Sequence, residues 1–137
     1  MPIDDDGRLR ELLDTTTTIA VVGCSSTPGK DAHDIPKYLL DAGYDVIPVN
    51  PFAEEIFDRK AYDSLADVPD KIDVVNVFRP SDEVPEIVDA ALDHEDEPAI
   101  WLQLGITHDD AVARAEDAGR RVVQDHCLKV EHQRLLA

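Results

Sequence analysis

The chain has 137 residues, of which 30 are acidic and 13 are basic, so its formal net charge at pH 7 is −17. This length fits one domain with an ordinary hydrophobic core, and the charge excludes the basic face that nucleic-acid binding requires. The acidic residues are spread over every segment. We therefore infer an acidic, halophilic protein, in which molar salt shortens the range of charge repulsion to ~3 Å. The alternative is an acidic protein of a mesophile.

The two cysteines, Cys24 and Cys127, are too few for a disulfide framework and fit a reducing compartment. The N-terminus lacks the basic start and apolar run of a signal peptide, and no segment is apolar enough to span a membrane. The five histidines show no metal-ligand spacing with each other or with the cysteines. We expect a cytoplasmic protein with no metal and no membrane partner. Residues 1–137 are predicted to form a single domain.

The first helix is predicted within residues 1–16, where three leucines at positions 7–14 recur at helical spacing. The apolar run at 18–22 predicts a strand buried on both faces, as central strands of parallel sheets are. A helix is predicted over residues 31–42. It should begin between positions 31 and 34, with Asp34 as its N-cap, because a proline beyond the first turn removes a hydrogen bond. Its expected inner face consists of Ile35, Tyr38, Leu39 and Ala42.

Residues 45–49 predict a second strand, in which Pro48 cannot donate to a ladder. One side of this strand should therefore be poorly paired. Residues 53–62 are compatible with only a short edge strand, and a helical turn is expected near positions 64–67.

The second half of the chain alternates apolar strands with amphipathic helices. Strands are expected at 72–78, 99–104 and 121–124. Ser81 should cap the first of the following helices, and Thr107 with Asp110 should cap the second, which ends at Gly119. A terminal helix within residues 127–137 should contain Leu128, Leu135 and Leu136. This alternation predicts an α/β fold with a doubly wound, mainly parallel sheet of about five to six strands.

The loop after the first strand has the composition of an anion site. It begins with Gly23, Cys24, Ser25 and Ser26. Lys30 ends it directly before a helix, whose free N–H groups and positive end attract phosphate. The P-loop pattern fails at Pro28 and Asp31, and the dinucleotide pattern is matched only at its first glycine. The loop therefore predicts a phosphate compound and argues against an ATPase.

In a doubly wound sheet of order 3-2-1-4-5-6, ligands bind at the carboxyl ends of the first and fourth strands. Arg79 would then face the loop and give a phosphate a bidentate contact. The other interpretation of Arg79 is a surface salt bridge with a carboxylate. Asn50 and Pro51 stand where NAD enzymes place an acid that binds the ribose hydroxyls. A neutral asparagine suits a ribose with a 3′-phosphate, which points toward coenzyme A (CoA).

Five segments together resemble the small stand-alone CoA-binding proteins, and these resemble the N-terminal CoA-binding domain of the succinyl-CoA synthetase α-subunit. The segments are Gly23-x-Ser25, 47–51 (Ile-Pro-Val-Asn-Pro), 61–69 (Ala-Tyr-x-Ser-Leu-Ala-Asp-Val-Pro), 77–79 (Val-Phe-Arg) and 101–105 (Trp-Leu-Gln-Leu-Gly). The resemblance covers residues 18–135 and implies a Rossmann-like fold with CoA across the carboxyl edge of the sheet.

The resemblance also implies where the parts of CoA lie. The pyrophosphate would lie over residues 23–26 and the adenosine near Asn50 and Pro51. The pantetheine arm would pass Phe78 and Arg79 toward Leu104, Gly105 and Ile106. Phe52 departs from the pattern, because members often carry a basic residue there, so one partner for the 3′-phosphate is missing.

The resemblance implies binding of CoA or acyl-CoA without catalysis. The synthetase's phospho-histidine lies in a second domain, and no catalytic triad or pair of catalytic carboxylates can be recognised in the sequence. The alternative is a nucleotide-dependent enzyme, either an NAD(P)-linked oxidoreductase or an acyl-CoA ligase component that acts with a separate chain. A homodimer or an unknown protein partner also remains open.

Cys127 is a candidate thiol partner for the ligand. Strand spacing of ~4.8 Å puts the end of the last strand roughly 14 Å from Cys24, which is too far for a disulfide. An extended pantetheine arm spans that distance, so Cys127 could form a mixed disulfide with CoA under oxidation. The alternative is a buried, inert cysteine.

Overall fold

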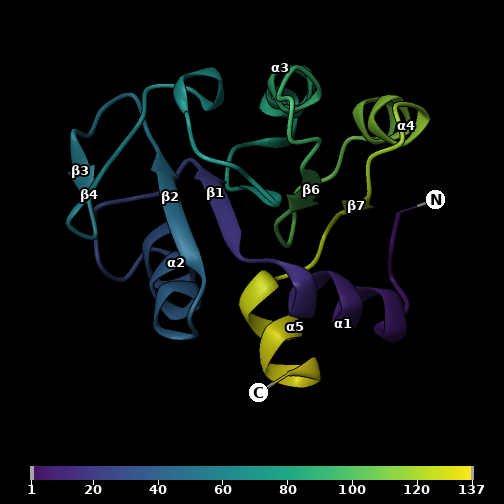
Figure 1. Cartoon of the computed structure of the whole chain (residues 1–137), viewed down its shortest axis with the longest axis horizontal. Helices are drawn as coiled ribbons and strands as arrows, with labels where there is room; N and C mark the ends of the chain where they lie inside the picture. Colours follow the sequence, from purple (N-terminus) through teal and green to yellow (C-terminus); the bar gives the residue numbers. More distant parts are fainter. Residues whose placement is uncertain (1, 137) are drawn as a thin grey trace.

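The computed structural model describes residues 2–136, and strands alternate with helices along most of the chain (Figure 1). The strands are β1 (Thr18–Val22), β2 (Asp45–Val49), β3 (Glu55–Ile56), β4 (Arg59–Lys60), β5 (Val74–Val77), β6 (Ala99–Leu102) and β7 (Val122–Val123). The helices are α1 (Asp6–Thr15), α2 (Asp31–Asp41), α3 (Val84–Leu92), α4 (Asp109–Asp117) and α5 (Leu128–Leu135), with 3-10 turns η1 (Leu65–Asp67) and η2 (Ser81–Glu83). Met1 and Ala137, the outer ends of the predicted domain, lie outside the described residues.

Five parallel strands form one sheet in the order β2-β1-β5-β6-β7. The chain goes from β1 to β2 on one side and then returns to β5 on the other side of β1. The strand order therefore reverses between β1 and β5, where doubly wound sheets bind ligands. This topology confirms the predicted Rossmann-like α/β fold.

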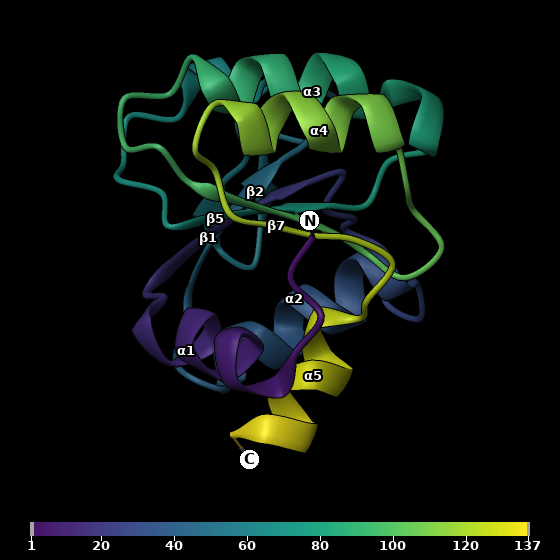
Figure 2. The same cartoon turned by 90° about the vertical axis from the view of Figure 1, so that its right-hand side faces the viewer.

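The helices form two layers, with α3 and α4 over one face of the sheet and α1, α2 and α5 over the other (Figure 2). Each layer encloses its own buried cluster. Leu9 and Trp101 are fully buried on the α1, α2 and α5 side, and Ile47 and Leu102 on the α3 and α4 side. Because both faces are covered, the strands are continuous apolar runs rather than alternating ones.

The prediction of a poorly paired second strand is confirmed. β2 is the edge of the five-stranded sheet, and beyond it the chain adds a single bridge between Val49 and Tyr62. The short edge strand expected in residues 53–62 is instead an antiparallel pair, β3 and β4, which forms a separate sheet beside β2 (Figure 1). Two consecutive turn residues at positive φ, Phe57 and Asp58, reverse the chain and prevent a continuous strand.

The start of α2 lies where the sequence predicts, but its cap does not. The helix begins at Asp31, and no side chain caps it. The prediction of Asp34 as N-cap is wrong: this residue lies in the first turn, and its carboxylate accepts the N–H of Gly29 at 3.1 Å. Ala42 follows the last helical residue and is exposed, so it is not part of the buried face.

Two further predicted caps are also wrong. The hydroxyl of Ser81 does not cap α3, since it accepts the N–H of Thr107 at 3.1 Å. α4 is capped by His108, whose Nδ1 accepts the N–H of Ala111 at 3.1 Å, rather than by Thr107. α5 contains Leu128 and Leu135, whereas Leu136 lies just past its end. For Ser81, an N–H group from a distant loop occupies the oxygen that was expected to cap the helix. For Thr107, the neighbouring His108 side chain takes the helix N–H group instead.

Candidate functional site

The loop between β1 and α2 is closed by a hydrogen bond that Pro36 makes available. Because Pro36 has no N–H, the carbonyl oxygen of Ala32 has no partner one turn later in α2. The N–H of Ser25 donates to this oxygen at 2.9 Å. The Ser25 hydroxyl then accepts the N–H of Thr27 at 3.1 Å. The loop therefore folds back onto the first turn of α2.

This fold-back leaves donors of the loop available at the positive end of α2. Within residues 2–136, the N–H of Ser26 has no hydrogen-bond partner and the Lys30 ammonium makes no ion pair. Asp34 opposes anion binding here. The hydrogen bond from Gly29, together with that from His33, holds the pKa of Asp34 below its usual range. A phosphate is therefore limited to the donors that Asp34 leaves free.

Gly23 lies where the ends of three strands meet. Its φ is +89°, and a Cβ at this position would lie 2.8 Å from Cδ of Arg79 and 3.1 Å from the carbonyl oxygen of Phe78. Its N–H donates to the carbonyl oxygen of Val49 at 2.9 Å. The position therefore requires glycine for its backbone conformation and for its space.

Asn50 fixes the distance between the ends of β1 and β2. Its Nδ2 donates to the carbonyl oxygen of Cys24 at 2.9 Å, and its Oδ1 accepts the N–H of Phe52 at 2.7 Å. The second bond, with Pro51 between the partners, forms an Asx-type turn. Asn50 thus shapes this part of the site through the backbone.

A groove of about 490 Å³ opens at these strand ends, against α3. Four residues singled out from the sequence line it, namely Gly23, Asn50, Pro51 and Arg79. The opposite wall is one edge of η2 and α3, which was not predicted from the sequence as part of the site. It consists of Glu83, Glu86, Ile87 and Ala90. Their recurrence at three- and four-residue intervals could have identified this edge. The lining is completed by Val22, Val49, Phe52, Asp63, Ser64 and Leu65.

Arg79 is held by a carboxylate of the same groove. Its Nε donates to Oε1 of Glu83 at 3.2 Å, and a terminal nitrogen donates to Oε2 at 2.7 Å. This hydrogen bond lowers the pKa of Glu83 and raises the pKa of Arg79. The salt-bridge interpretation therefore describes Arg79 in this structure, although the residue also lines the groove.

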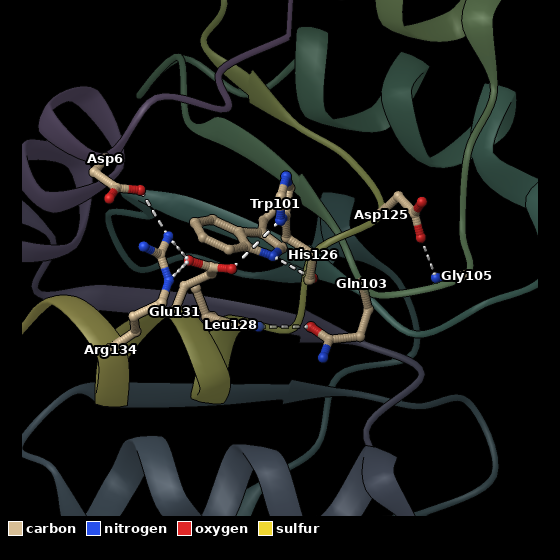
Figure 3. Close-up of polar contacts among 9 residues, drawn as sticks. All are labelled: Asp6, Trp101, Gln103, Gly105, Asp125, His126, Leu128, Glu131 and Arg134. Atoms are coloured by element: carbon tan, nitrogen blue, oxygen red, sulfur yellow. Dashed lines mark hydrogen bonds and ion pairs between the residues drawn. The ribbon is translucent and has the colours of Figure 1, made fainter.

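The loop after β6 is joined to the segment that leads into α5 (Figure 3). The N–H of Gly105 donates to Oδ1 of Asp125 at 2.7 Å, and the amide oxygen of Gln103 accepts the N–H of Leu128 at 3.3 Å. These contacts place the end of β6 beside the segment that contains Cys127. Neither the end of β6 nor the segment that contains Cys127 lines the groove.

The remaining predicted site residues differ in exposure. Leu104 is 65% exposed, whereas Ile106 and Phe78 pack against the two core clusters. Cys24 is fully buried and Cys127 is half-buried, and both are free thiols. Burial raises the pKa of Cys24 to about 12, so this thiol is neutral at physiological pH. Because its side chain is buried, Cys24 can contact a ligand only through its backbone.

Among residues 2–136, no three His, Cys, Asp or Glu side chains are grouped so that they could hold a metal ion. In the same part of the chain, no helix has both the length and the apolar character needed to cross a membrane.

Residues 17–133 match the CoA binding domain family, and the chain belongs to this family. It is 40% identical over 124 residues to the uncharacterized protein YneT of Bacillus subtilis, covering 90% of this chain and 91% of that protein. It is also 38% identical over 72 residues to the ADP-forming acetate–CoA ligase of Methanocaldococcus jannaschii, which is 53% of this chain and 10% of the ligase.

Solved structures show the same relationships. A hypothetical protein from Pyrococcus horikoshii OT3 superposes with a TM-score of 0.93 at 40% identity, and the match covers 100% of this chain and 97% of that one. The dinucleotide forming acetyl-coenzyme A synthetase 1 of Ca. Korarchaeum cryptofilum gives a TM-score of 0.72 at 31% identity, over 84% of this chain and 27% of the synthetase. The fold thus occurs both as a whole protein and as part of larger ones.

Proposed function

We propose that this protein binds CoA or an acyl-CoA at the carboxyl edge of the sheet and does not catalyse a reaction by itself. The observation that carries the proposal is the groove between the end of β2 and α3, which adjoins the loop at the N-terminus of α2. Membership of the CoA binding domain family supports it. A volume of about 490 Å³ is within the range of small-molecule sites.

The proposal assigns each part of CoA to a part of the site. The pyrophosphate accepts hydrogen bonds from the loop that contains Cys24, Ser25 and Ser26, with Lys30 as counter-ion. The adenosine occupies the groove beside Asn50 and Pro51. The pantetheine arm passes Phe78 and Arg79 toward Leu104, Gly105 and Ile106. The crowding of Gly23 by Arg79 supports this assignment, because it keeps the loop and the groove adjacent.

Cys127 is the proposed partner of the CoA thiol. An oxidant such as a disulfide would accept the two electrons released when the two thiols join, and two protons would leave. Mass spectrometry of the protein treated with CoA disulfide should show a CoA adduct that is absent from Cys127→Ser. An adduct of the same yield on Cys127→Ser would exclude this role.

A second candidate function is supported by the similarity to ADP-forming acetate–CoA ligases and the acetyl-coenzyme A synthetase. The chain matches only about a tenth of the first two ligases. On this alternative, the protein is a CoA-binding component that works with a separately encoded chain. It predicts that a partner copurifies with the tagged protein and that the pair forms acetyl-CoA from acetate, CoA and ATP, with release of ADP and phosphate.

The deciding experiment is calorimetric titration with CoA, acetyl-CoA and NAD in molar KCl, where the charged chain is screened. Binding of CoA or acetyl-CoA without binding of NAD is expected. Gly23→Ala should weaken this binding, whereas Val130→Ala on α5 should not. Binding of NAD without CoA would replace the proposal with the NAD(P)-linked oxidoreductase.

A further inference from the structure

The ring of Phe52 lies almost entirely outside the protein. Phe52 is 95% exposed, whereas the other two phenylalanines, Phe57 and Phe78, pack against a core cluster. Phe52 is also one of the residues that line the groove of the candidate site. A phenyl ring in water forgoes the stabilisation that burial would give. Its place at the rim of a ligand groove indicates that the ligand itself covers the ring.

The backbone that carries Phe52 is already ordered. The N–H of Phe52 donates to Oδ1 of Asn50 at 2.7 Å, and the N–H of Ala53 donates to the carbonyl oxygen of Asn50 at 3.5 Å. Pro51 restricts the turn further through its fixed φ. Only the side-chain torsions of Phe52 remain to be ordered, so stacking on a flat ligand group costs little conformational entropy.

The charges around the groove disfavour a phosphate at this end. Three carboxylates line it, from Asp63, Glu83 and Glu86. Within residues 2–136, Arg79 is the only basic side chain in the lining, and Glu83 already holds its guanidinium. The net negative charge of this lining would repel a 3′-phosphate on the ribose, whereas it would not repel a neutral purine base.

We propose that Phe52 stacks on the adenine base of the bound ligand, and that this end of the groove does not select for the 3′-phosphate of CoA. The proposal rests on the proposed function and names the feature of the ligand that the groove recognises. CoA therefore binds no more than about threefold more tightly than 3′-dephospho-CoA, because base stacking supplies affinity that does not depend on the 3′-phosphate.

The test uses the full chain and three probes: CoA, 3′-dephospho-CoA and 4′-phosphopantetheine, which lacks the base. The variants are Phe52→Ala, Phe52→Lys and Phe52→Trp, with Val130→Ala as the control, because Val130 is 51% exposed on a different helix. Titrations are run at the lowest KCl concentration at which circular dichroism shows every variant folded. Charge selection is then not hidden by screening.

Phe52→Ala should weaken CoA and 3′-dephospho-CoA by the same factor, about tenfold, and leave 4′-phosphopantetheine unchanged. Phe52→Lys should lose stacking but gain preference for CoA over 3′-dephospho-CoA, which proves that the assay detects phosphate selection. In Phe52→Trp, CoA should quench the new indole, while the fully buried Trp101 contributes a constant background. Val130→Ala should bind as the wild type does.

A wild-type preference for CoA over 3′-dephospho-CoA larger than about threefold would overturn the inference. Undiminished CoA binding by Phe52→Ala would overturn only this inference and leave the proposed function intact. If that variant also sediments as a smaller species, the ring is a contact between copies of the chain. Failure of the wild type to bind CoA would overturn both the inference and the proposed function.

Discussion

The amide of Asn50 bridges the ends of two parallel strands, since its Nδ2 lies 2.9 Å from the carbonyl oxygen of Cys24 and its Oδ1 lies 2.7 Å from the nitrogen of Phe52. Removing this side chain leaves a part-buried carbonyl without its partner. Asn50→Ala is therefore expected to lose about 1–3 kcal/mol of unfolding free energy in urea titrations. Ser64→Ala is the control, because that hydroxyl bonds only an exposed carboxylate. A loss no larger than that of the control would refute the bridging role.

The second prediction separates backbone strain from crowding with two glycines of similar φ. Gly23 (φ +89°) is crowded by Arg79, whereas Gly29 (φ +96°) has no atom within 4 Å of an added Cβ. Gly29→Ala should cost about 1–2 kcal/mol of stability, from backbone strain alone. Gly23→Ala should cost about 2–4 kcal/mol because its side chain must also displace a neighbour. Equal losses in urea unfolding would show that Arg79 yields without cost.

The third prediction concerns the ion pair of Arg79 and Glu83. Glu83→Gln removes the negative charge and releases the guanidinium for the pyrophosphate over the neighbouring loop, so the dissociation constant for CoA should fall by about two- to fivefold. Glu86→Gln is the matched control, because it removes a charge from the same groove without touching that pair. If both variants tighten binding equally, the general field of the groove matters and the release of Arg79 does not.

The fourth prediction is a loss of stability at alkaline pH. Burial raises the pKa of Cys24 from 9.0 to about 12, and burial with Asp14 nearby raises that of Tyr44 from 10.0 to about 12. Between these values the folded state holds protons that the unfolded state has lost. The stabilisation is therefore complete below about pH 9 and falls as pH rises toward 12. Urea midpoints measured across this range should fall less steeply in Cys24→Ala and Tyr44→Phe. Parallel curves for variants and wild type would contradict it.

The fifth prediction is a strong dependence of stability on salt. At a net charge of −17, self-repulsion destabilises the compact state in dilute buffer. The urea midpoint should rise steeply with KCl and level off near molar concentration, where the screening length is ~3 Å. Sucrose at equal osmolality is the control for non-ionic effects. A midpoint that does not change with KCl would favour the alternative of an acidic protein of a mesophile.

Much of the architecture could be predicted because burial on both faces of a parallel sheet leaves a local signature. The apolar runs at residues 18–22 and 72–78 identify central strands without knowledge of their neighbours, and the latter strand is observed at Val74–Val77. Pro48 likewise indicates an edge, because a missing N–H limits pairing wherever the strand lies. The family resemblance rests on short motifs that can likewise be recognised locally in the sequence, and the match over residues 17–133 confirms it.

Details of the candidate site depend on partners far along the chain. The sequence places Arg79 at a strand end, but only the tertiary structure pairs its guanidinium with Glu83 on the next helical turn rather than leaving it free. Asp34 and Ser81 have the right residue types for helix caps, yet loop N–H groups take their oxygens. Local propensity cannot decide between such acceptors, because the competing donor becomes available only when the chain folds.

The sequence by itself therefore determined the order of the helices and of the strands of the main sheet, and the family. Only the tertiary structure decided that Pro36 frees a carbonyl for Ser25, that α3 forms a wall of the groove, and that Phe52 stays outside the core. The physical reason is the range of the interactions. Hydrophobic periodicity and missing donors act within a few residues, whereas groove shape, charge pairing and exposure arise from groups that are brought together by folding.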